Sequence, residues 1–406
     1  RRSRDSQMTA RHSESSLRVV LGVTGGIAAY KAVQIARSLV TKGHQVTVIP
    51  TASALKFVGR PTWEAISRQD VPVDLFDGVA EVTHVALGQQ ADLVIVAPAT
   101  ANFLAHYAHG TAEDLLGTTL LATTAPVVLA PAMHTEMWEN PATTENLAAL
   151  AARGIHVIGP EPGPLTGTDS GPGRMSEPED IVDYALSVVG PRPLTGRKVL
   201  ISAGGTREPI DPVRFIGNRS TGAMGVALAQ TAATLGAEVT LVHGALEVTP
   251  PREVECVFAP TAADMHREMV SRFPDSSIAI MAAAVADWSV EPAAEKLTKD
   301  EGASWPEMAQ TPDIAAELGA SKTTEQRLVV FAAETTADDE ELLARARAKM
   351  QSKSADMVVA NRVGEQVGFG QTDTAVWIVQ RSGAPVLSTG SKLTVAGHLF
   401  DVLLSP

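Results

Sequence analysis

The sequence has one cysteine, no long hydrophobic run and a shortage of positive charge, and each scarcity excludes a class of protein. With Cys256 as the only cysteine, neither an intrachain disulfide nor a cysteine cluster for zinc can form. No apolar run approaches the roughly 20 residues that a membrane-spanning helix needs. The formal net charge of −13 argues against general binding to nucleic acids or anionic membranes. We therefore expect a cytoplasmic protein without nucleic-acid or membrane partners, with Cys256 as an inert core residue of an apolar strand.

The composition is that of a globular protein, because 45% of the residues are hydrophobic and 19% are charged. A length of 406 residues exceeds one ordinary hydrophobic core and favours two domains. The Pro- and Gly-rich segment 190–196 precedes a new first strand, so we expect a linker there between domains at 17–189 and 197–406. Residues 1–16 are polar, and we expect them to form a disordered tail.

Both halves open with a β-rich run that ends in a glycine pair, at 25–26 and at 204–205, and continues as a helix. Later strands, at 92–97 and 278–281, are continuously apolar, which indicates sheets covered by helices on both faces. The alternation of strands and helices predicts an α/β fold with two doubly wound, Rossmann-like parallel sheets, of which the first is flavodoxin-like.

Glycines and hydroxyl residues follow the strands of the first half at their carboxyl ends, where α/β sheets bind ligands. Gly25 and Gly26 would let backbone N–H groups approach a phosphate at a helix N-terminus. The second strand is followed by Thr51 rather than by the carboxylate that holds an adenosine ribose, which disfavours a nicotinamide dinucleotide. We predict a mononucleotide whose phosphate meets the glycines, Thr51 and Ser53. We interpret the Gly- and Pro-rich stretch 159–173 as an irregular, mobile flap over this site.

In the second half, the Gly-rich insert 203–222 follows the first strand, at the usual edge of a nucleotide site. The strand at 278–281 runs into small residues that allow close approach of a base or ribose. Asp287 then follows, as a candidate for binding ribose hydroxyls or holding Mg²⁺ through phosphate. Lys349 and Lys353 are four residues apart and share one helix face, which indicates either anion binding or an ordinary solvated face.

The first half resembles the flavin-containing cysteine decarboxylase family. The matching segments are GGIAAYK (25–31), TASALKF (51–57), THVAL (83–87), ADLVIVAPATAN (91–102), PAMHTEMW (131–138) and GPGRM (171–175). They span nearly the whole half in order, which is far more specific than any single segment.

The second half resembles the phosphopantothenate–cysteine ligase domain, so the whole chain is similar to the bifunctional phosphopantothenoylcysteine decarboxylase and phosphopantothenate–cysteine ligase family. The matching segments are AGGTREPIDPVRFIGNRSTG (203–222), AAAVADW (282–288), EKLTK (295–299), TPDI (311–314), VVFAAET (329–335), KMQSKSAD (349–356) and VANRV (359–363).

The resemblance implies that the first half is an FMN-dependent decarboxylase. The flavin would oxidise the cysteinyl side chain to a thioaldehyde, CO₂ would leave, and the electrons would return to the product. His84 is implied as the catalytic base and Arg174 as a substrate contact. The residues implied to bind FMN are Gly25, Gly26, Thr51, Ser53, Pro98, Thr100 and Asn102.

Two positions of the first half depart from that family. His134 stands where the family has asparagine, and we include it among the catalytic candidates. The family's flap cysteine aligns with Gly167, and no thiol lies anywhere in this half. Thr168, Asp169, His134 or water would then supply the last proton. These departures favour one alternative, a non-catalytic flavin-binding regulatory or scaffold domain beside an active ligase.

For the second half, the resemblance implies a CTP-dependent ligase. The carboxylate of 4′-phosphopantothenate would attack CTP, giving an acyl-cytidylate that the amine of L-cysteine converts to an amide. Mg²⁺ would bind through the nucleotide phosphates. The resemblance also implies homo-oligomers, with decarboxylase trimers and ligase dimers combined in a dodecamer.

The implied ligase residues fall into two groups. Arg214 and Asn218 lie on the substrate side, and Asn218 and Lys296 are the catalytic candidates. The nucleotide contacts are Met281, Ala282, Ala283, Asp287, Lys296, Thr311, Pro312, Asp313, Ile314, Phe331, Lys349 and Lys353. The ligase product is the decarboxylase substrate, so the two halves would together make 4′-phosphopantetheine for coenzyme A.

Overall fold

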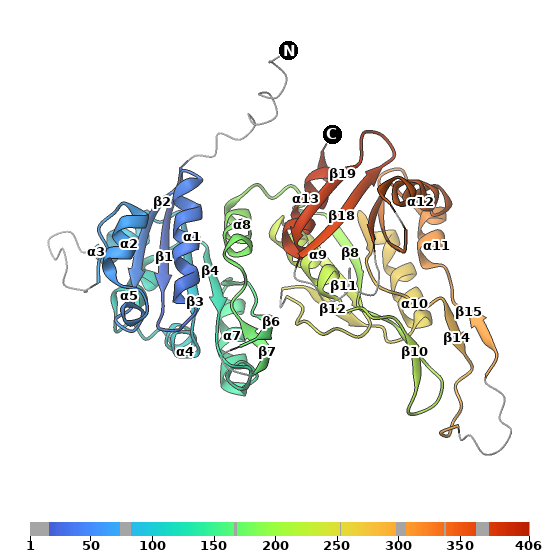
Figure 1. The fold of residues 1–406 in the computed structure, drawn as a ribbon, viewed down its shortest axis with the longest axis horizontal. Coiled ribbons are helices and arrows are strands. Elements are labelled where there is room, and N and C mark those ends of the chain that lie inside the picture. The colour runs from blue at the N-terminus through green and yellow to red at the C-terminus, as the bar shows by residue number, and fades with distance from the viewer. Residues whose placement is uncertain are drawn as a thin grey trace, which may run out of the picture. The chain divides into compact units, whose positions relative to one another are not determined.

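The chain forms two compact units, Arg1–Val189 and Gly190–Pro406 (Figure 1). The computed structural model describes residues 16–73, 83–165, 169–251, 253–297, 306–336, 338–362 and 373–405. The predicted tail therefore lies outside the described residues except for Ser16, whose hydroxyl donates to the Gly43 carbonyl at 2.8 Å. Within the described ranges, no helix is long and apolar enough to cross a membrane.

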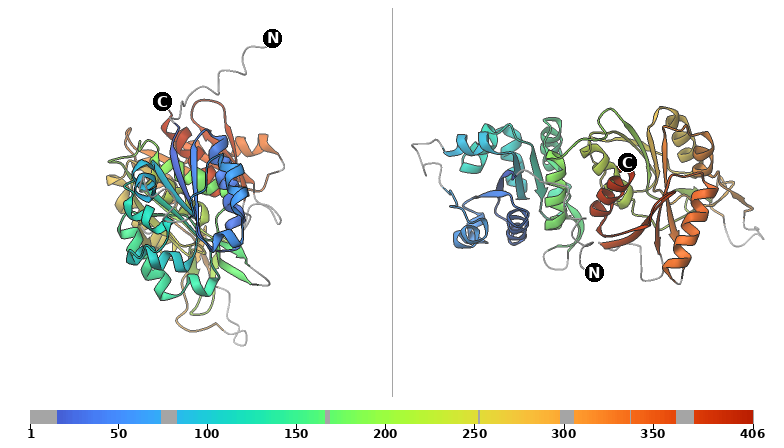
Figure 2. Two further views of the ribbon diagram at one scale, coloured as in Figure 1. Left: turned by 90° about the vertical axis from the view of Figure 1, so that its left-hand side faces the viewer. Right: turned by 90° about the horizontal axis from the view of Figure 1, so that it is seen from above.

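The N-terminal unit contains a five-stranded sheet with helices on both faces and a separate two-stranded hairpin (Figures 1 and 2). Its strands are β1 (Arg18–Val23), β2 (Gln45–Pro50), β3 (Leu93–Ala99), β4 (Val127–Pro131), β5 (His156–Val157), β6 (Glu161–Pro164) and β7 (Ser170–Arg174). Its helices are α1 (Ala29–Thr41), α2 (Arg60–Ser67), α3 (Thr83–Gln90), α4 (Ala101–His109), α5 (Leu115–Ala122), α6 (Thr135–Trp138), α7 (Pro141–Ala152) and α8 (Pro178–Val189), with a short 3-10 turn, η1, at Ala54–Lys56.

Burial on both faces explains this architecture. All seven residues of β3 are buried, as expected for a central strand covered on both sides. Helix α1 buries a single stripe with helical spacing and packs against α8 on one face. Helices α4, α5 and α7 supply the core residues of the other face. The predicted α/β fold of this half is therefore confirmed.

The strand order β2-β1-β3-β4-β5 is entirely parallel and creates a topological switch point between β1 and β3. The chain leaves β1 towards β2 on one side and later returns to β3 on the other. In open α/β sheets, ligands bind at the carboxyl ends of the strands at such a switch point.

The C-terminal unit has an eight-stranded sheet with the order β12-β11-β8-β13-β16-β17-β18-β19 and two separate strand pairs, β10-β9 and β14-β15. Its strands are β8 (Lys198–Ala203), β9 (Arg207–Pro209), β10 (Phe215–Gly217), β11 (Glu238–His243), β12 (Glu255–Phe258), β13 (Ile278–Met281), β14 (Trp288–Val290), β15 (Met308–Gln310), β16 (Arg327–Glu334), β17 (Met357–Arg362), β18 (Asp373–Gln380) and β19 (Val386–Ser391). Its helices are α9 (Ala223–Thr234), α10 (Ala262–Arg272), α11 (Ile314–Ser321), α12 (Asp339–Ser352) and α13 (Lys392–Leu404), with a 3-10 turn, η3, at Phe273–Asp275.

Helices cover both faces of this second sheet as well, with α9 and α13 on one side and α10, α11 and α12 on the other (Figure 2). The parallel sheet predicted from the sequence covers six adjacent strands, in the order β12, β11, β8, β13, β16 and β17. Two further strands, β18 and β19, which the sequence analysis did not predict, extend the sheet antiparallel at one edge. The switch point of this sheet lies between β8 and β13.

The segment 159–173 is not the irregular stretch that we expected, because most of it forms the antiparallel β6–β7 hairpin. The hairpin docks on the loop after β4. The Met133 amide donates to the Gly173 carbonyl at 3.0 Å, and a Cβ on Gly171 would lie 2.4 Å from Thr135 Oγ1. Backbone pairing and close glycine contacts therefore order this segment without a hydrophobic pattern.

Cys256 is also misplaced by the sequence reasoning. It lies on β12, an outer strand of the sheet, and its side chain is exposed rather than in the core. Although the residue is exposed overall, partial burial of its sulfur beside the Val254 carbonyl and the neighbouring charge of Glu255 raise the pKa of its thiol, which favours the unreactive protonated form.

The hairpin contact predicts a large effect for Gly173→Ala. The backbone φ of Gly173 is +152°, and an added Cβ would lie 2.2 Å from the Met133 carbonyl oxygen. We expect a loss of about 2 kcal/mol and a fall of roughly 4–8 °C in the thermal midpoint of the N-terminal unit. Calorimetry would measure it. Gly154→Ala is the matched control, since φ there is +81° but nothing lies within 4 Å. Equal losses in both variants would contradict the docking argument.

Candidate active sites

In the N-terminal unit, the loops after β1 and β3 are joined by the hydroxyl of Thr24. This buried hydroxyl donates to the Pro98 carbonyl at 2.7 Å and accepts from the Thr100 amide at 3.2 Å. The Thr100 hydroxyl lies 3.2 Å from it and caps α4 by accepting from the Phe103 amide. Thr100 and the first turn of α4, which carries the exposed Asn102, therefore lie directly beside the β1 turn.

The loop after β2 closes on the same turn. A Cβ on Gly25 would lie only 2.3 Å from Ser53 Cβ, so this position accepts no side chain. Thr51 is fixed through its amide, which donates to the Val23 carbonyl at 2.9 Å. Gly26 is half-buried and has only Thr100 and Pro98 within 4 Å of an added Cβ. The structure thus brings together all seven residues that the sequence assigned to the cofactor.

Three polar side chains near β4 and the hairpin are also part of this edge. His134 precedes α6, and its Nδ1 lies 3.8 Å from Asp169 Oδ2. Arg174 pairs with Glu177 at 3.2 Å. Among the described residues, Arg174 Nε and Thr135 Oγ1 are buried without a hydrogen-bond partner. Such buried, unpaired polar atoms are expected where a polar ligand completes the site.

His84 is placed differently. It lies in the first turn of α3, and α3 packs against α5. Its Nδ1 is buried and has no partner in the described part of the chain. No hydrogen bond between His84 and the glycine turn occurs within those ranges, so the structure does not join His84 to the other predicted residues. Gly167 and Thr168 lie outside the described residues.

In the C-terminal unit, backbone hydrogen bonds join the loops after β8 and β13. The Ala284 amide donates to the Gly204 carbonyl at 2.8 Å, and the Thr206 amide donates to Ala284 at 3.2 Å. The buried Thr206 hydroxyl accepts from the Ala286 amide at 2.9 Å. Asn218 reaches the same place, since its side-chain amide donates to the Val285 carbonyl at 3.1 Å.

Hydrogen bonds from Ser202 on β8 and from Thr311 fix the loop of small residues after β13. The buried Ser202 hydroxyl accepts from the Ala283 amide at 3.2 Å and lies 3.8 Å from the Met281 sulfur. Thr311 donates from its hydroxyl to Ala286 at 2.6 Å and from its amide to the Asp287 carbonyl at 3.0 Å. The turn at 311–314 therefore adjoins the loop at 282–287.

Asp313 connects this turn to the lysine helix. It caps α11 by accepting from the Ala316 amide at 3.0 Å, and it forms an ion pair with Lys353. Burial acts to raise the pKa of Asp313, but the hydrogen bonds from Lys353 and Ala316 and the charges of Lys353 and Lys349 lower it overall. Both predicted lysines thus lie near the predicted turn. Phe331 on β16 is half-buried and packs against the core.

Arg214 is engaged mainly within the protein. Its guanidinium binds buried Asp211 at 2.9 Å and the Leu297 carbonyl at 2.9 Å. Asp211 also accepts from the Leu297 amide at 3.2 Å. The Arg214 guanidinium, assisted by backbone amides and opposed by burial, holds the pKa of this carboxyl well below its usual range. This network fixes the backbone beside the exposed Lys296.

Sequence reasoning missed the residues that hold these sites together. They are Thr24, Lys31, Glu177, Ser202, Thr206 and Asp211. Lys31 and Glu177 form an ion pair at 3.0 Å that ties α1 to the end of the hairpin. For Thr24 and Thr206, the only signal in the sequence was their position beside the two glycine pairs.

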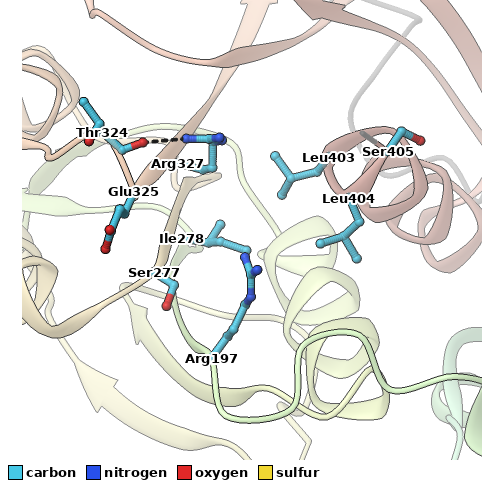
Figure 3. Close-up of a pocket in the computed structure, with 9 residues that line it drawn as sticks. All are labelled: Arg197, Ser277, Ile278, Thr324, Glu325, Arg327, Leu403, Leu404 and Ser405. Atoms are coloured by element: carbon cyan, nitrogen blue, oxygen red, sulfur yellow. Dashed lines mark hydrogen bonds between the residues drawn. The ribbon is translucent and has the colours of Figure 1, made fainter.

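A separate hollow of about 620 Å³ lies at the opposite edge of the C-terminal sheet (Figure 3). It is lined by residues at the amino ends of β8, β13 and β16 and at the end of α13, including Arg197, Arg327 and Leu404. Arg327 Nη1 donates to the Thr324 carbonyl at 3.0 Å. None of the predicted site residues lines this hollow, so it is separate from the candidate sites.

Comparison with known proteins assigns both halves. Residues 7–190 match the Flavoprotein family, and residues 194–405 match the family described as the DNA/pantothenate metabolism flavoprotein C-terminal domain. Coenzyme A biosynthesis bifunctional protein CoaBC of Mycobacterium tuberculosis is 44% identical over 408 residues, which cover 97% of this chain and 98% of that protein.

The Vibrio cholerae protein of the same name is 40% identical and covers 95% of this chain and 97% of its own length. The crystal structure of a C-terminal domain of CoaBC is 34% identical and covers 52% of this chain and 96% of that domain, with a TM-score of 0.44. The resemblance identified in the sequence is therefore confirmed, and the chain belongs to the family of bifunctional coenzyme A biosynthesis enzymes, which carry a decarboxylase and a ligase.

Proposed function

We propose that this protein couples 4′-phosphopantothenate with L-cysteine at the expense of CTP and then decarboxylates the product to 4′-phosphopantetheine. The observation that carries this proposal is that each unit assembles a polar, glycine-rich edge at its own switch point, with the residues expected for its half of the chemistry. The alternative of a non-catalytic flavin-binding domain finds no support, because the full-length relatives are bifunctional by name.

The N-terminal edge fits FMN. Gly25 allows Ser53 to pack closely on the β1 turn, and Gly26 has no atom closer than 3.5 Å to an added Cβ, so the backbone there could approach a phosphate beside Thr51 and Ser53. Thr100, Pro98 and Asn102 border it from the α4 side. FMN would supply the two-electron oxidation and reduction that this decarboxylation requires. The protein would bind the phosphate, orient the substrate and move protons.

We assign His84 as the base that takes the thiol proton of the substrate. Its buried, unpaired Nδ1 supports a role completed by a ligand or by another subunit. Arg174 is assigned to a substrate anion, since its Nε is buried without a partner among the described residues.

The C-terminal edge fits a nucleoside triphosphate. Strand β13 ends at Met281 and is followed by the small residues Ala282 and Ala283, which leave room for a nucleotide. Lys296, Lys349 and Lys353 would supply cationic charge for its phosphates. Asp287 ends the same loop, and the turn at 311–314, which consists of Thr311, Pro312, Asp313 and Ile314, adjoins it through the hydrogen bonds of Thr311. Phe331 lies on β16, the strand next to β13. Mg²⁺ would bind through the phosphates.

For the ligation step, Asn218 is assigned to the acyl-cytidylate and Arg214 to the substrate side. The contact of Asn218 with the Val285 carbonyl supports this, because it places the amide at the nucleotide loop. We further propose domains at 17–189 and 197–406 joined by the linker 190–196, which agrees with the division of the chain after Val189.

A cytoplasmic location and a homo-oligomer are also proposed. The resemblance implies decarboxylase trimers and ligase dimers combined in a dodecamer. This assembly rests on the resemblance, and analytical ultracentrifugation of the purified chain would test it.

The function is tested by incubating the protein with FMN, Mg²⁺, CTP, 4′-phosphopantothenate and L-cysteine and identifying products by mass spectrometry. We expect 4′-phosphopantetheine, CO₂, CMP and pyrophosphate. Accumulation of phosphopantothenoylcysteine alone would overturn the decarboxylase assignment, and no new product would overturn both.

Two variants separate the active sites. We expect His84→Asn to lower decarboxylation of supplied phosphopantothenoylcysteine by about 10²–10³-fold while ligation stays unchanged, because a general base contributes that much. Lys296→Gln is expected to do the reverse, lowering ligation and sparing decarboxylation. Each variant serves as the control for the other, and loss of both activities in either would contradict the division of roles.

The Asp211 network predicts a third effect. Asp211→Asn removes the charge that holds Arg214 and Leu297, so we expect the KM for CTP to rise roughly 10–100-fold, equivalent to a lost charged hydrogen bond. Because the folded pKa of Asp211 is depressed, the wild-type contact is complete above the ordinary value of about 3.9 and is lost only at lower pH. The defect should therefore be the same at every pH in the assay range.

Steady-state ligation kinetics measure this effect, and Asp264→Asn is the matched control. The pKa of Asp264 is also lowered, mainly by the Thr261 hydroxyl and against the effect of burial, but Asp264 lies in the first turn of α10, where its amide donates to the capping Thr261 hydroxyl at 3.1 Å. An unchanged KM for CTP in Asp211→Asn would show that the network does not position Lys296.

A further inference from the structure

The decarboxylation proposed above requires one proton that the substrate does not carry. A carbon–carboxylate bond breaks and a carbon–hydrogen bond replaces it, so one proton is consumed for each CO₂ released. The two electrons removed from the substrate thiol carbon return to it at the end, so the flavin is unchanged overall. An acid must therefore protonate the carbon that has lost CO₂, before or as the electrons return.

His134 is placed to carry that proton. It stands at the carboxyl end of β4, in the loop that leads into α6. Its Nδ1 faces Asp169 Oδ2 at 3.8 Å, which is an ion-pair contact rather than a hydrogen bond. With Nδ1 directed at the carboxylate, Nε2 is the nitrogen left to meet a substrate. The carboxylate beside Nδ1 orients the ring, and an imidazolium N–H at Nε2 can act as an acid.

The hairpin holds this pair in place through its backbone. Asp169 precedes β7, and β7 is fastened to the His134 loop by the hydrogen bond between Met133 and Gly173. Gly171 packs directly on Thr135, the residue after His134. The hydroxyl of Thr135 is buried and unpaired among the described residues, so a polar ligand group is expected beside His134.

Other candidate acids are less suited. The only cysteine of the chain, Cys256, belongs to the C-terminal unit. Glu136 on α6 is exposed to solvent. Arg174 on β7 pairs with Glu177 and does not release a proton. Of the charged groups on the elements packed against His134, only Asp169 lies within ion-pair distance in the described ranges.

We propose that His134 is the acid that protonates the decarboxylated carbon, and that Asp169 is the positioning residue that orients its imidazole. This inference rests on the proposed decarboxylase function and deepens it. His134 gives up one proton from Nε2 in each turnover and regains it from solvent, so the protein ends the cycle unchanged.

The test is a single turnover of the flavin-loaded, full-length enzyme with phosphopantothenoylcysteine, in which CO₂ and product are measured separately. For His134→Asn we expect CO₂ release within about threefold of wild type and formation of 4′-phosphopantetheine slowed at least tenfold. The decarboxylated enethiol, two mass units lighter than the product, should accumulate. Product formation at the wild-type rate would overturn the proposal.

Asp169→Asn tests the positioning role. We expect product formation to slow by about three- to tenfold, and the pH above which it declines to move towards acid, because the charged imidazole has lost its counter-ion. Glu136→Gln is the matched control, since it removes a neighbouring carboxylate that makes no ion pair with His134. An unchanged pH profile in Asp169→Asn, or an equal shift in Glu136→Gln, would overturn the role of Asp169.

Failure of the inference is distinguishable from failure of the proposed function. If wild-type protein releases no CO₂, the decarboxylase assignment fails. If wild type is active and both variants keep coupled CO₂ and product formation at the wild-type rate, only the assignment of His134 and Asp169 fails. Flavin absorbance and ligase activity of each variant report whether it is folded, and Asp169→Asn remains decisive if His134→Asn loses its flavin.

Discussion

A buried threonine hydroxyl at the switch point is the interaction on which both active edges depend. Thr24 links the loops after β1 and β3, and Thr206 links the loops after β8 and β13. At a switch point, the segments that follow the two adjacent strands run to opposite sides of the sheet, so the chain itself does not connect the two loops directly. A hydroxyl can donate and accept at once, so the Thr24 side chain, which one loop carries, satisfies two backbone groups of the other loop, while the Thr206 hydroxyl accepts from one amide of its neighbouring loop. Leaving such buried groups unpaired would cost about 1–3 kcal/mol at each site.

This constraint also explains how much of each site could be predicted from the sequence. Continuous apolar runs and glycine pairs locate the central strands and their carboxyl ends, and residues at those ends must share one edge. Gly25, Ser53 and Thr100 are therefore brought together as expected. His84 is different, because it lies on a helix before β3, and no strand end determines which neighbour its ring faces.

The errors follow from information that a single sequence does not carry. Apolar periodicity does not distinguish parallel from antiparallel partners, so the reversed edge strands β18 and β19 were missed. The exposure of Cys256 depends on its strand lying at the edge, which is a property of strand order. The β6–β7 hairpin is stabilised by backbone pairing and by Gly171 and Gly173 packing on the β4 loop, and these contacts leave no hydrophobic pattern. Asp211 was overlooked because its partner Leu297 lies 86 residues away.

The way in which the hairpin is fastened bears directly on the choice of acid. A thiol is an acid when neutral, whereas an imidazole is an acid only when it is positively charged, so it needs a counter-ion close by. In this chain the counter-ion, Asp169, comes from the hairpin, and the imidazole comes from the loop on which the hairpin docks. The backbone contacts of Gly171 and Gly173 fix the separation of the two groups. Histidine at position 134 and aspartate at position 169 are therefore coupled choices: removing either leaves the other with little to contribute, and their effects on proton delivery should not add.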